Sequence, residues 1–220
     1  MDVALSMSAA SALVALLDQI ALEPQNLTSI EGLDEGIDRH LADSLAGLEL
    51  AAVAGAATSV DIGSGAGFPG LALAIARPEM LVTLVESERR KADWLRRASA
   101  AIPNVRVVHD RSEHLAATER ETFDLATMRA LGPLPVALEL AAPFVRIGGS
   151  VVAWRGDDAD PAGEAASMRA AALLGLEPTP AVVSRAFPGA RRRLQAFTKV
   201  SAAPSRFPRR PGRAVKRPLG

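Results

Sequence analysis

Short apolar runs and segments of helical periodicity alternate along the middle of the chain. The apolar runs predict strands near residues 59–62, 81–86, 105–109, 123–128 and 150–154. Helical periodicity between or after these runs predicts helices near residues 71–76, 89–101, 134–145 and 163–174. Such alternation is typical of an α/β protein with a largely parallel sheet that helices cover on both faces.

The two ends of the chain depart from this alternation. Residues 9–22 and 37–53 have helical periodicity with no strand between them, which predicts a helical extension over residues 1–55. Residues 181–186 and 194–200 predict two strands whose connection is too short for a helix, so these strands should be antiparallel. We therefore expect a Rossmann-like domain over residues 56–200, with a mostly parallel seven-stranded sheet and an antiparallel terminal hairpin. Residues 201–220 would form a separate tail.

The first predicted strand ends on a carboxylate and continues into a glycine-rich loop. Asp61 is followed by Gly63, Gly65 and Gly67, and a fourth glycine stands at position 70. Glycine permits positive φ and has no Cβ, so a bulky ligand can lie directly against the backbone. A loop of this kind between a strand and a helix predicts a site for a nucleotide-containing cofactor.

Two classes of cofactor fit this loop. The segment from Gly65 to Gly70 matches the dinucleotide fingerprint GxGxxG, and Glu86 follows about 20 residues later, as that motif requires. Asp61 favours S-adenosylmethionine instead, because a carboxylate at this position repels a pyrophosphate and suits a cationic amino-acid group. With either cofactor Glu86 would accept hydrogen bonds from a ribose diol. We predict S-adenosylmethionine bound by Asp61, Gly63, Gly65, Gly67 and Glu86, and keep a nicotinamide-dependent oxidoreductase as an alternative.

The charge of the chain is balanced overall but unevenly distributed. The whole chain has 25 basic and 25 acidic residues, whereas residues 178–220 have 11 basic residues and no acidic ones. An acidic body with a basic end suggests a polyanionic partner, with a solvated tail as the alternative. Proline and glycine interrupt residues 206–213, so we expect an irregular arm that orders on its ligand. The predicted RNA-binding residues are Arg206, Arg209, Arg210, Lys216 and Arg217.

Composition excludes several other classes of site. The chain has no cysteine, so it has neither disulfides, nor a thiolate metal site, nor a thiol nucleophile, in keeping with a cytoplasmic protein. No uninterrupted apolar segment of about 20 residues predicts a membrane span, and no leader peptide is evident. His109 and His114 lack the spacing of metal ligands, so we expect no metal.

The chemistry of the methyl acceptor is constrained by what the sequence lacks. Methylation of cytosine C5 requires a cysteine, and the segment after the fourth strand, residues 128–133, has no Asn-Pro-Pro-aromatic motif for an exocyclic amine. An acceptor that is nucleophilic at neutral pH, such as guanine N7, needs only alignment and a suitable electrostatic environment. Arg129 lies at the carboxyl end of a strand, where ligands of such sheets bind, and is the predicted catalytic residue. His40, Asp43 and Ser44 lie on one predicted helix and could either belong to the site or pair locally.

Several motifs together resemble the bacterial 16S rRNA guanine-N7 methyltransferases of the GidB (RsmG) type. The resemblance extends through most of the chain. It rests on Asn26-Leu27-Thr28, His40-x-x-Asp43-Ser44-Leu45, the segment from Asp61 to Gly70 with its Phe68-Pro69-Gly70 ending, Arg77-Pro78, Glu86-Ser87, Lys91, Arg129-Ala130, Phe207-Pro208-Arg209-Arg210-Pro211-Gly212 and Lys216-Arg217-Pro218-Leu219.

This resemblance implies a specific site and substrate. Gly63 and Phe68 would contact the cofactor, Glu86, Ser112 and Glu113 would meet its adenine or ribose, and Arg129 would lie in the site. The implied substrate is one guanine of the 530 loop of 16S rRNA in the 30S small ribosomal subunit. We expect a monomer. A non-catalytic rRNA-binding or ribosome-assembly protein with a residual cofactor loop remains an alternative.

Overall fold

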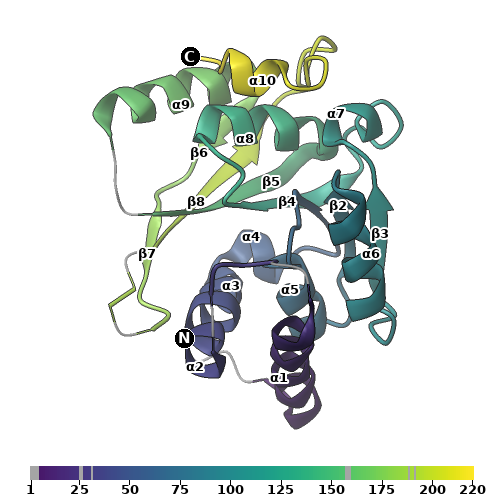
Figure 1. Cartoon of the computed structure of the whole chain (residues 1–220). Coiled ribbons are helices and arrows are strands. Elements are labelled where there is room, and N and C mark those ends of the chain that lie inside the picture. The colour runs from purple at the N-terminus through teal and green to yellow at the C-terminus, as the bar shows by residue number, and fades with distance from the viewer. Residues whose placement is uncertain (1–4, 25–26, 31, 157–159, 188, 191) are drawn as a thin grey trace.

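The computed structural model (Figure 1) describes residues 5–24, 27–30, 32–156, 160–187, 189–190 and 192–220. Asn26, which begins one of the motifs above, and Arg191, one of the eleven basic residues of 178–220, lie outside these residues. A single sheet runs through the molecule, and helices cover both of its faces. The predicted α/β class is therefore confirmed.

The sheet has eight strands in the order β3-β2-β1-β4-β5-β8-β6, with β7 paired to β8. The strands are β1 (Thr58–Ile62), β2 (Leu81–Glu86), β3 (Val105–His109), β4 (Phe123–Arg129), β5 (Val145–Gly156), β6 (Leu176–Pro178), β7 (Val182–Ser184) and β8 (Arg192–Lys199). The first five are parallel, and β8 is antiparallel to β5 and to both of its other neighbours. The order reverses between β1 and β4, so β1 and β4 end at a topological switch point, where such sheets bind ligands.

The predicted antiparallel terminal hairpin is confirmed as β7 and β8, but the expected number of strands is one too low. The short strand β6 pairs with the end of β8, and β7 pairs with its beginning. Pro178 is the last residue of β6, and Pro180 lies between the two pairings. Proline has no N–H to donate, so what could have been one edge strand is divided into two short ones.

Each face of the sheet has its own apolar core. On one face lie α1 (Met7–Leu22), α5 (Gly70–Ala76) and α6 (Arg89–Ala98), together with the rest of the N-terminal helices. On the other face lie α7 (Ser112–Leu115), α8 (Leu134–Ala141), α9 (Pro161–Leu173) and α10 (Arg213–Lys216). The glycine loop leaves β1 between these two layers, at the switch point.

The prediction of one regular helix over residues 37–53 is wrong, because the segment is helical but changes its helix type. After α2 (Leu33–Gly36) the chain forms a π-helix over Ile37–Ala42, then α3 (Asp43–Leu45) and a 3-10 turn over Ala46–Glu49; α4 (Ala51–Ala54) follows. The indole of Trp154 packs so closely on Gly47 that a Cβ there would lie 2.4 Å from the ring. Apolar periodicity cannot distinguish these helix types, and π-turns are frequent at functional sites. Here the π-turn contains His40.

The expectation that residues 206–213 form an arm that orders only on a ligand is also wrong. Phe207 and Ala214, each 3% exposed, pack into the core beside α8. The guanidinium of Arg120 donates to the carbonyl oxygens of Ala203, Pro204 and Phe207 at 2.6–3.1 Å. The count of positive charges gave no sign of these apolar anchors. The basic tail is a packed segment of the domain.

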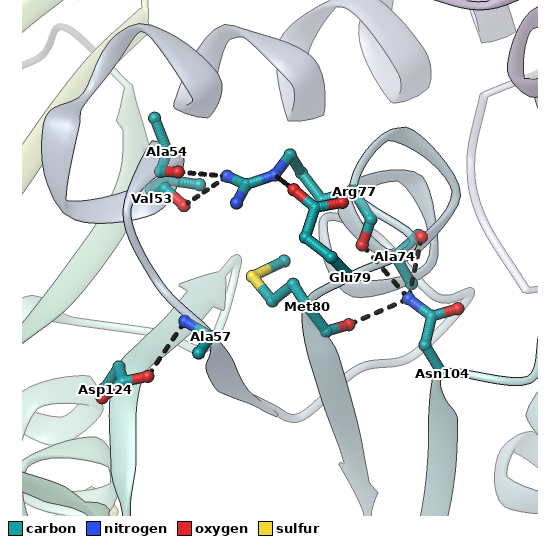
Figure 2. A network of polar contacts seen from close by, with 9 residues as sticks. All are labelled: Val53, Ala54, Ala57, Ala74, Arg77, Glu79, Met80, Asn104 and Asp124. Carbon is teal, nitrogen blue, oxygen red and sulfur yellow. Dashed lines mark hydrogen bonds and ion pairs between the residues drawn. The ribbon is translucent and has the colours of Figure 1, made fainter.

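A polar network fixes the N-terminal helices at the amino end of the parallel strands (Figure 2). Arg77 donates to the carbonyl oxygens of Val53 and Ala54 at the end of α4 and pairs with Glu79. Asn104 donates to three further carbonyl oxygens around the start of β2. Asp124 of β4 accepts from the backbone N–H of Ala57 at 2.9 Å. The helical region is therefore tied to the amino ends of the strands, and the glycine loop lies at their carboxyl ends.

Candidate cofactor and acceptor site

The glycine loop is anchored to β2 by its own backbone. The N–H groups of Gly63 and Ser64 donate to the carbonyl oxygen of Val85 at 2.9 and 3.1 Å. Gly63 and Gly65 have φ of 68° and 56°, a region that favours glycine. A Cβ on Gly65 would meet nothing closer than the carbonyl oxygen of Gly63 at 3.8 Å, so the backbone there faces open space. A ligand can approach the loop along this stretch.

Gly67 has a different reason for lacking a side chain. A Cβ at this position would lie 2.4 Å from Leu71 and 3.3 Å from Leu95, both in the core under the loop. The indole N–H of Trp94 donates to the carbonyl oxygen of Ala66 at 3.3 Å. Trp94 is buried and thus also holds the loop through this hydrogen bond.

The carboxylate of Glu86 holds the loop from the end of β2. One oxygen accepts from the N–H of Gly65 at 2.9 Å, and the other accepts from the N–H of Glu88 at 2.8 Å. The residue is 7% exposed. A carboxylate has about four acceptor positions, so capacity remains for two hydroxyl donors. This arrangement fits the expected ribose diol.

A pocket of about 170 Å³ lies beside the loop, and we call it the glycine-loop pocket. Gly63, Ser112 and Glu113 of the predicted cofactor residues line it. The remaining lining residues are mostly apolar and are Ile62, Val85, Ser87, Asp110, Arg111, Leu131, Val136, Leu140 and Val215. Apolar walls with a few polar groups at the rim suit a flat heterocycle with a polar sugar.

A second and larger opening, the arginine cleft, is lined by Ala130 and Gly132, whereas Leu131 between them lines the glycine-loop pocket. The volume of the cleft is about 560 Å³. Four arginines and one histidine contribute to its lining, together with Trp154: Arg39, His40, Arg129, Arg155 and Arg192. No acidic residue lines it within the part of the chain that the structure describes. The positive lining suits a phosphate-bearing ligand.

Arg129 connects the N-terminal helices to the loop. Its guanidinium donates to the carbonyl oxygen of Arg39 at 3.0 Å and to the buried carboxylate of Asp43 at 3.1 Å, and lies 5.5 Å from the ring centroid of Phe68. Arg192 approaches the other oxygen of Asp43 at 3.3 Å. Asp43 thus neutralises part of the positive charge of the cleft. Of the predicted cofactor residues, Phe68 and Arg129 lie on this side rather than in the glycine-loop pocket.

His40 is fixed between the same groups. Its ring stacks on Phe68 at 4.4 Å with an interplanar angle of 8°, and its Nδ1 accepts from Arg129 at 3.2 Å, because an arginine can only donate. Burial and the neighbouring Arg129 lower the pKa of His40 to about 4, so the ring is neutral at physiological pH. His40 and Asp43 therefore make long-range contacts in the site, whereas Ser44 pairs locally with the carbonyl oxygen of His40. Apolar periodicity gave no signal for this cluster.

Asp61 lies behind the loop and is 1% exposed. Its Oδ1 accepts from the hydroxyl of Thr127 at 2.7 Å, and its Oδ2 lies close to Gly70 without a hydrogen-bond partner. Burial raises the pKa of Asp61 to about 6 against the opposing hydrogen bond from Thr127. An unpaired buried carboxylate oxygen is costly, which is typical of a group kept for function.

We expect Asp61→Asn to gain stability relative to the wild type as the pH rises. The folded protein holds the proton of Asp61 up to about pH 6, and the unfolded chain releases it near 3.8, so the wild type loses stability between these values. This pKa difference corresponds to roughly 3 kcal/mol. Urea denaturation of both proteins at several pH values measures it. A stability difference that stays constant with pH would contradict the assignment.

Two further polar residues form ion pairs with acidic residues, and a third is exposed. Arg155 pairs with Glu164 at 2.7 Å, and His114 pairs with Asp110 at 3.1 Å. His109 is exposed at the end of β3. In the described ranges no group of His, Asp and Glu side chains is placed to hold a metal ion, and no helix is long and apolar enough to cross a membrane.

The fold is that of the Rossmann-like methyltransferases. A structure of a predicted O-methyltransferase from Agrobacterium tumefaciens, 26% identical, superimposes with a TM-score of 0.55 over 74% of this chain and 82% of that one. Fibrillarin of Methanococcus jannaschii, a pre-rRNA processing protein, is 15% identical and has a TM-score of 0.58 over 73% of this chain and 74% of its own. The second likeness concerns the fold alone.

Sequence comparison identifies the family. Residues 7–189 match the family described as GidB, rRNA small subunit methyltransferase G, and the chain belongs to it. The ribosomal RNA small subunit methyltransferase G of Chloroflexus aggregans is 43% identical over 200 residues, which are 88% of this chain and 82% of that protein. The one from Caldanaerobacter subterraneus is 35% identical over 90% of this chain and 84% of its own. The cofactor is S-adenosylmethionine, and the nicotinamide alternative falls away.

Proposed function

We propose that this protein transfers the methyl group of S-adenosylmethionine to N7 of one guanine in the 530 loop of 16S rRNA. Membership of the rRNA methyltransferase family supports the reaction class and the RNA substrate. The observation that carries the rest is that the glycine-loop pocket and the arginine cleft share one short segment, since Leu131 lines the first and Ala130 and Gly132 line the second. A cofactor in the first and a base in the second would meet beside this short segment, with the methyl group directly against N7.

The proposal gives each part of the glycine loop a role toward the cofactor. The open backbone at Gly65 would lie against it, Gly63 would line its pocket, Glu86 would accept from its ribose, and Ser112 and Glu113 would border its adenine. Asp61 would act from behind the loop, because it is buried, and Gly67 would act by packing. When bound, S-adenosylmethionine supplies an electrophilic methyl group on a sulfonium.

The arginine cleft has the chemistry that guanine N7 requires. N7 carries a lone pair at neutral pH, so the attack needs no base, and no acidic side chain lines the described part of the cleft. His40 is neutral and already accepts from Arg129. Arg129 would bind the O6 edge of the guanine or its phosphate and hold N7 in line with the methyl group. Asp43 would offset the charge of Arg129 when the methylated base becomes cationic.

We also propose that the basic tail binds the RNA backbone, although not with all five predicted residues. Arg206, Arg210, Lys216 and Arg217 are exposed. Arg209 is instead bound to the buried carboxylate of Glu139. Its role is to anchor the tail.

Neutralising these four exposed side chains with glutamine should weaken RNA binding and flatten its salt dependence. For each phosphate that a variant no longer binds, the slope of log affinity against log salt should fall by roughly 0.7 to 0.9. Filter binding to 16S rRNA at several salt concentrations measures the slope, with Arg146→Gln as a control for a remote exposed arginine. An unchanged slope would remove the tail from RNA binding.

The decisive experiment follows the label from S-adenosylmethionine into RNA. Purified protein is incubated with unmethylated 16S rRNA or 30S particles, and N7-methylguanine is mapped by borohydride reduction and aniline cleavage. Cleavage at one 530-loop guanine would support the proposal, and incorporation elsewhere would move the acceptor. RNA binding without incorporation would favour the non-catalytic assembly protein. We further propose that the protein acts as a monomer in the cytoplasm, which light scattering and fractionation would test.

A further inference from the structure

The C-terminal segment, residues 207–217, reaches the glycine-loop pocket. The backbone N–H of Gly212 donates to the carboxylate of Glu113 at 3.2 Å. Three residues later Val215 lines the pocket, although it is 66% exposed. An exposed valine at the rim of an apolar pocket offers a surface that a ligand could cover. The far end of the chain therefore contributes to the wall at which we place the adenine.

The segment is held in this position by a buried ion pair. Glu139 in α8 is 0% exposed and accepts from both the backbone N–H and the Nε of Arg209, at 2.9 and 2.8 Å. The same guanidinium donates to the carbonyl oxygen of Arg217 at 2.8 Å, which closes the segment into a loop around α10. A bidentate pair of this kind fixes both distance and orientation. If the segment moved away, Arg209 would leave and the buried negative charge of Glu139 would have lost this positive partner.

The outside of the same segment is the basic surface. Arg210, Lys216 and Arg217 are exposed, and Lys216 directly follows Val215 in the chain. No ion pair joins these three side chains to an acid within the part of the chain that the structure describes. RNA on this outer side and a cofactor on the inner side would contact the same four-residue helix.

We propose that the C-terminal segment is a shared wall that couples RNA binding to cofactor binding, with Val215 as the residue that contacts the adenine. RNA phosphates on the outer side stabilise the segment in its position against the pocket. The cofactor on the inner side stabilises the same position, in which the basic side chains bind the RNA. The two ligands then strengthen each other by the same factor, as linkage requires. The inference rests on the assignment of S-adenosylmethionine to the glycine-loop pocket.

The wall is tested by the affinity for S-adenosylhomocysteine, measured by isothermal titration calorimetry. Val215→Ser should weaken binding about fivefold, because it removes apolar surface that the adenine covers. Val183→Ser in β7 is the matched control, since Val183 is 55% exposed and lies far along the chain from the pocket. Equal affinities of the two variants would overturn the role of Val215. Absence of binding to the wild-type protein would instead overturn the assignment of the pocket.

The coupling is tested by repeating the titration with saturating 16S rRNA. The wild-type protein should bind S-adenosylhomocysteine at least about threefold more tightly with RNA than without it. Replacing Arg210, Lys216 and Arg217 by glutamine should leave the affinity without RNA within about twofold and abolish this gain. An RNA effect smaller than twofold on the wild type, or a gain that survives the triple replacement, would overturn the coupling.

Discussion

Gly65→Asp should abolish methyl transfer by preventing cofactor binding. The backbone of Gly65 faces open space, and its N–H donates to Glu86, so the new carboxylate would enter the cofactor path beside an existing one. Two adjacent carboxylates repel each other, and a ligand that buries them must remove their hydration. We expect the affinity for S-adenosylhomocysteine to fall at least about 100-fold. Calorimetry and the methyl-transfer assay measure the affinity and the activity.

Gly65→Asn is the control that separates charge from size. Asparagine has the shape of aspartate and tolerates the φ of 56° at this position about as well. We expect it to lose affinity to a smaller extent, about tenfold, because only bulk is added. Thermal unfolding should show that both variants fold. Binding of S-adenosylhomocysteine to the folded aspartate variant at wild-type affinity would mean that the cofactor does not pass over Gly65.

Arg129→Ala should reduce the rate of methyl transfer far more than the affinity for the cofactor. Arg129 lies in the arginine cleft, while the glycine-loop pocket keeps its lining. Loss of a group that orients the acceptor typically costs about 10² to 10³ in rate. Single-turnover methylation of 16S rRNA and titration with S-adenosylhomocysteine separate the two effects. A parallel collapse of both would make Arg129 a cofactor ligand.

This substitution also has a structural cost that needs its own control. Without Arg129, Asp43 keeps Arg192 at 3.3 Å as its one cationic partner among the described residues. Removal of one partner of a buried pair typically costs about 3 to 5 kcal/mol. Arg129→Lys keeps the charge but loses the planar fork, so it should be more stable than the alanine variant and still slow. Arg146→Ala, which removes an exposed arginine paired with Asp124, should change neither quantity. Full activity of the lysine variant would show that charge alone suffices.

Local pattern was enough to predict the sheet and the glycine loop. The strands β1, β2 and β4 are largely buried, and their apolar runs end at turns, so position and type could be predicted together. The loop could be predicted because its glycines lie close together in the chain. The hydrogen bond from Trp94 to Ala66, by contrast, joins residues 28 positions apart and left no mark on the periodicity.

The contacts that could not be predicted join distant segments. His40 and Asp43 contact Arg129, which lies about 90 residues later in the chain. No spacing or periodicity in the sequence specifies that contact. The tail was misjudged because eleven positive charges over 43 residues suggested an arm that orders on its ligand. Buried contacts decide where it lies instead, since Glu139 binds Arg209 and both Phe207 and Ala214 pack into the core. Charge counts describe the surface of a segment, and its fold depends on the few residues that face inward.

The two attachments of the N-terminal helices differ in what a chimera between relatives would preserve. At the amino ends of the parallel strands, Arg77 binds the backbone carbonyl oxygens of Val53 and Ala54, which any sequence supplies. At the carboxyl ends of these strands, Asp43 binds Arg129 and Arg192 through its side chain. A recombinant joined near residue 55 would therefore keep the first attachment whenever the parent of its C-terminal part contributes Arg77. It would keep the second only if one parent contributes the acid and the other contributes both arginines.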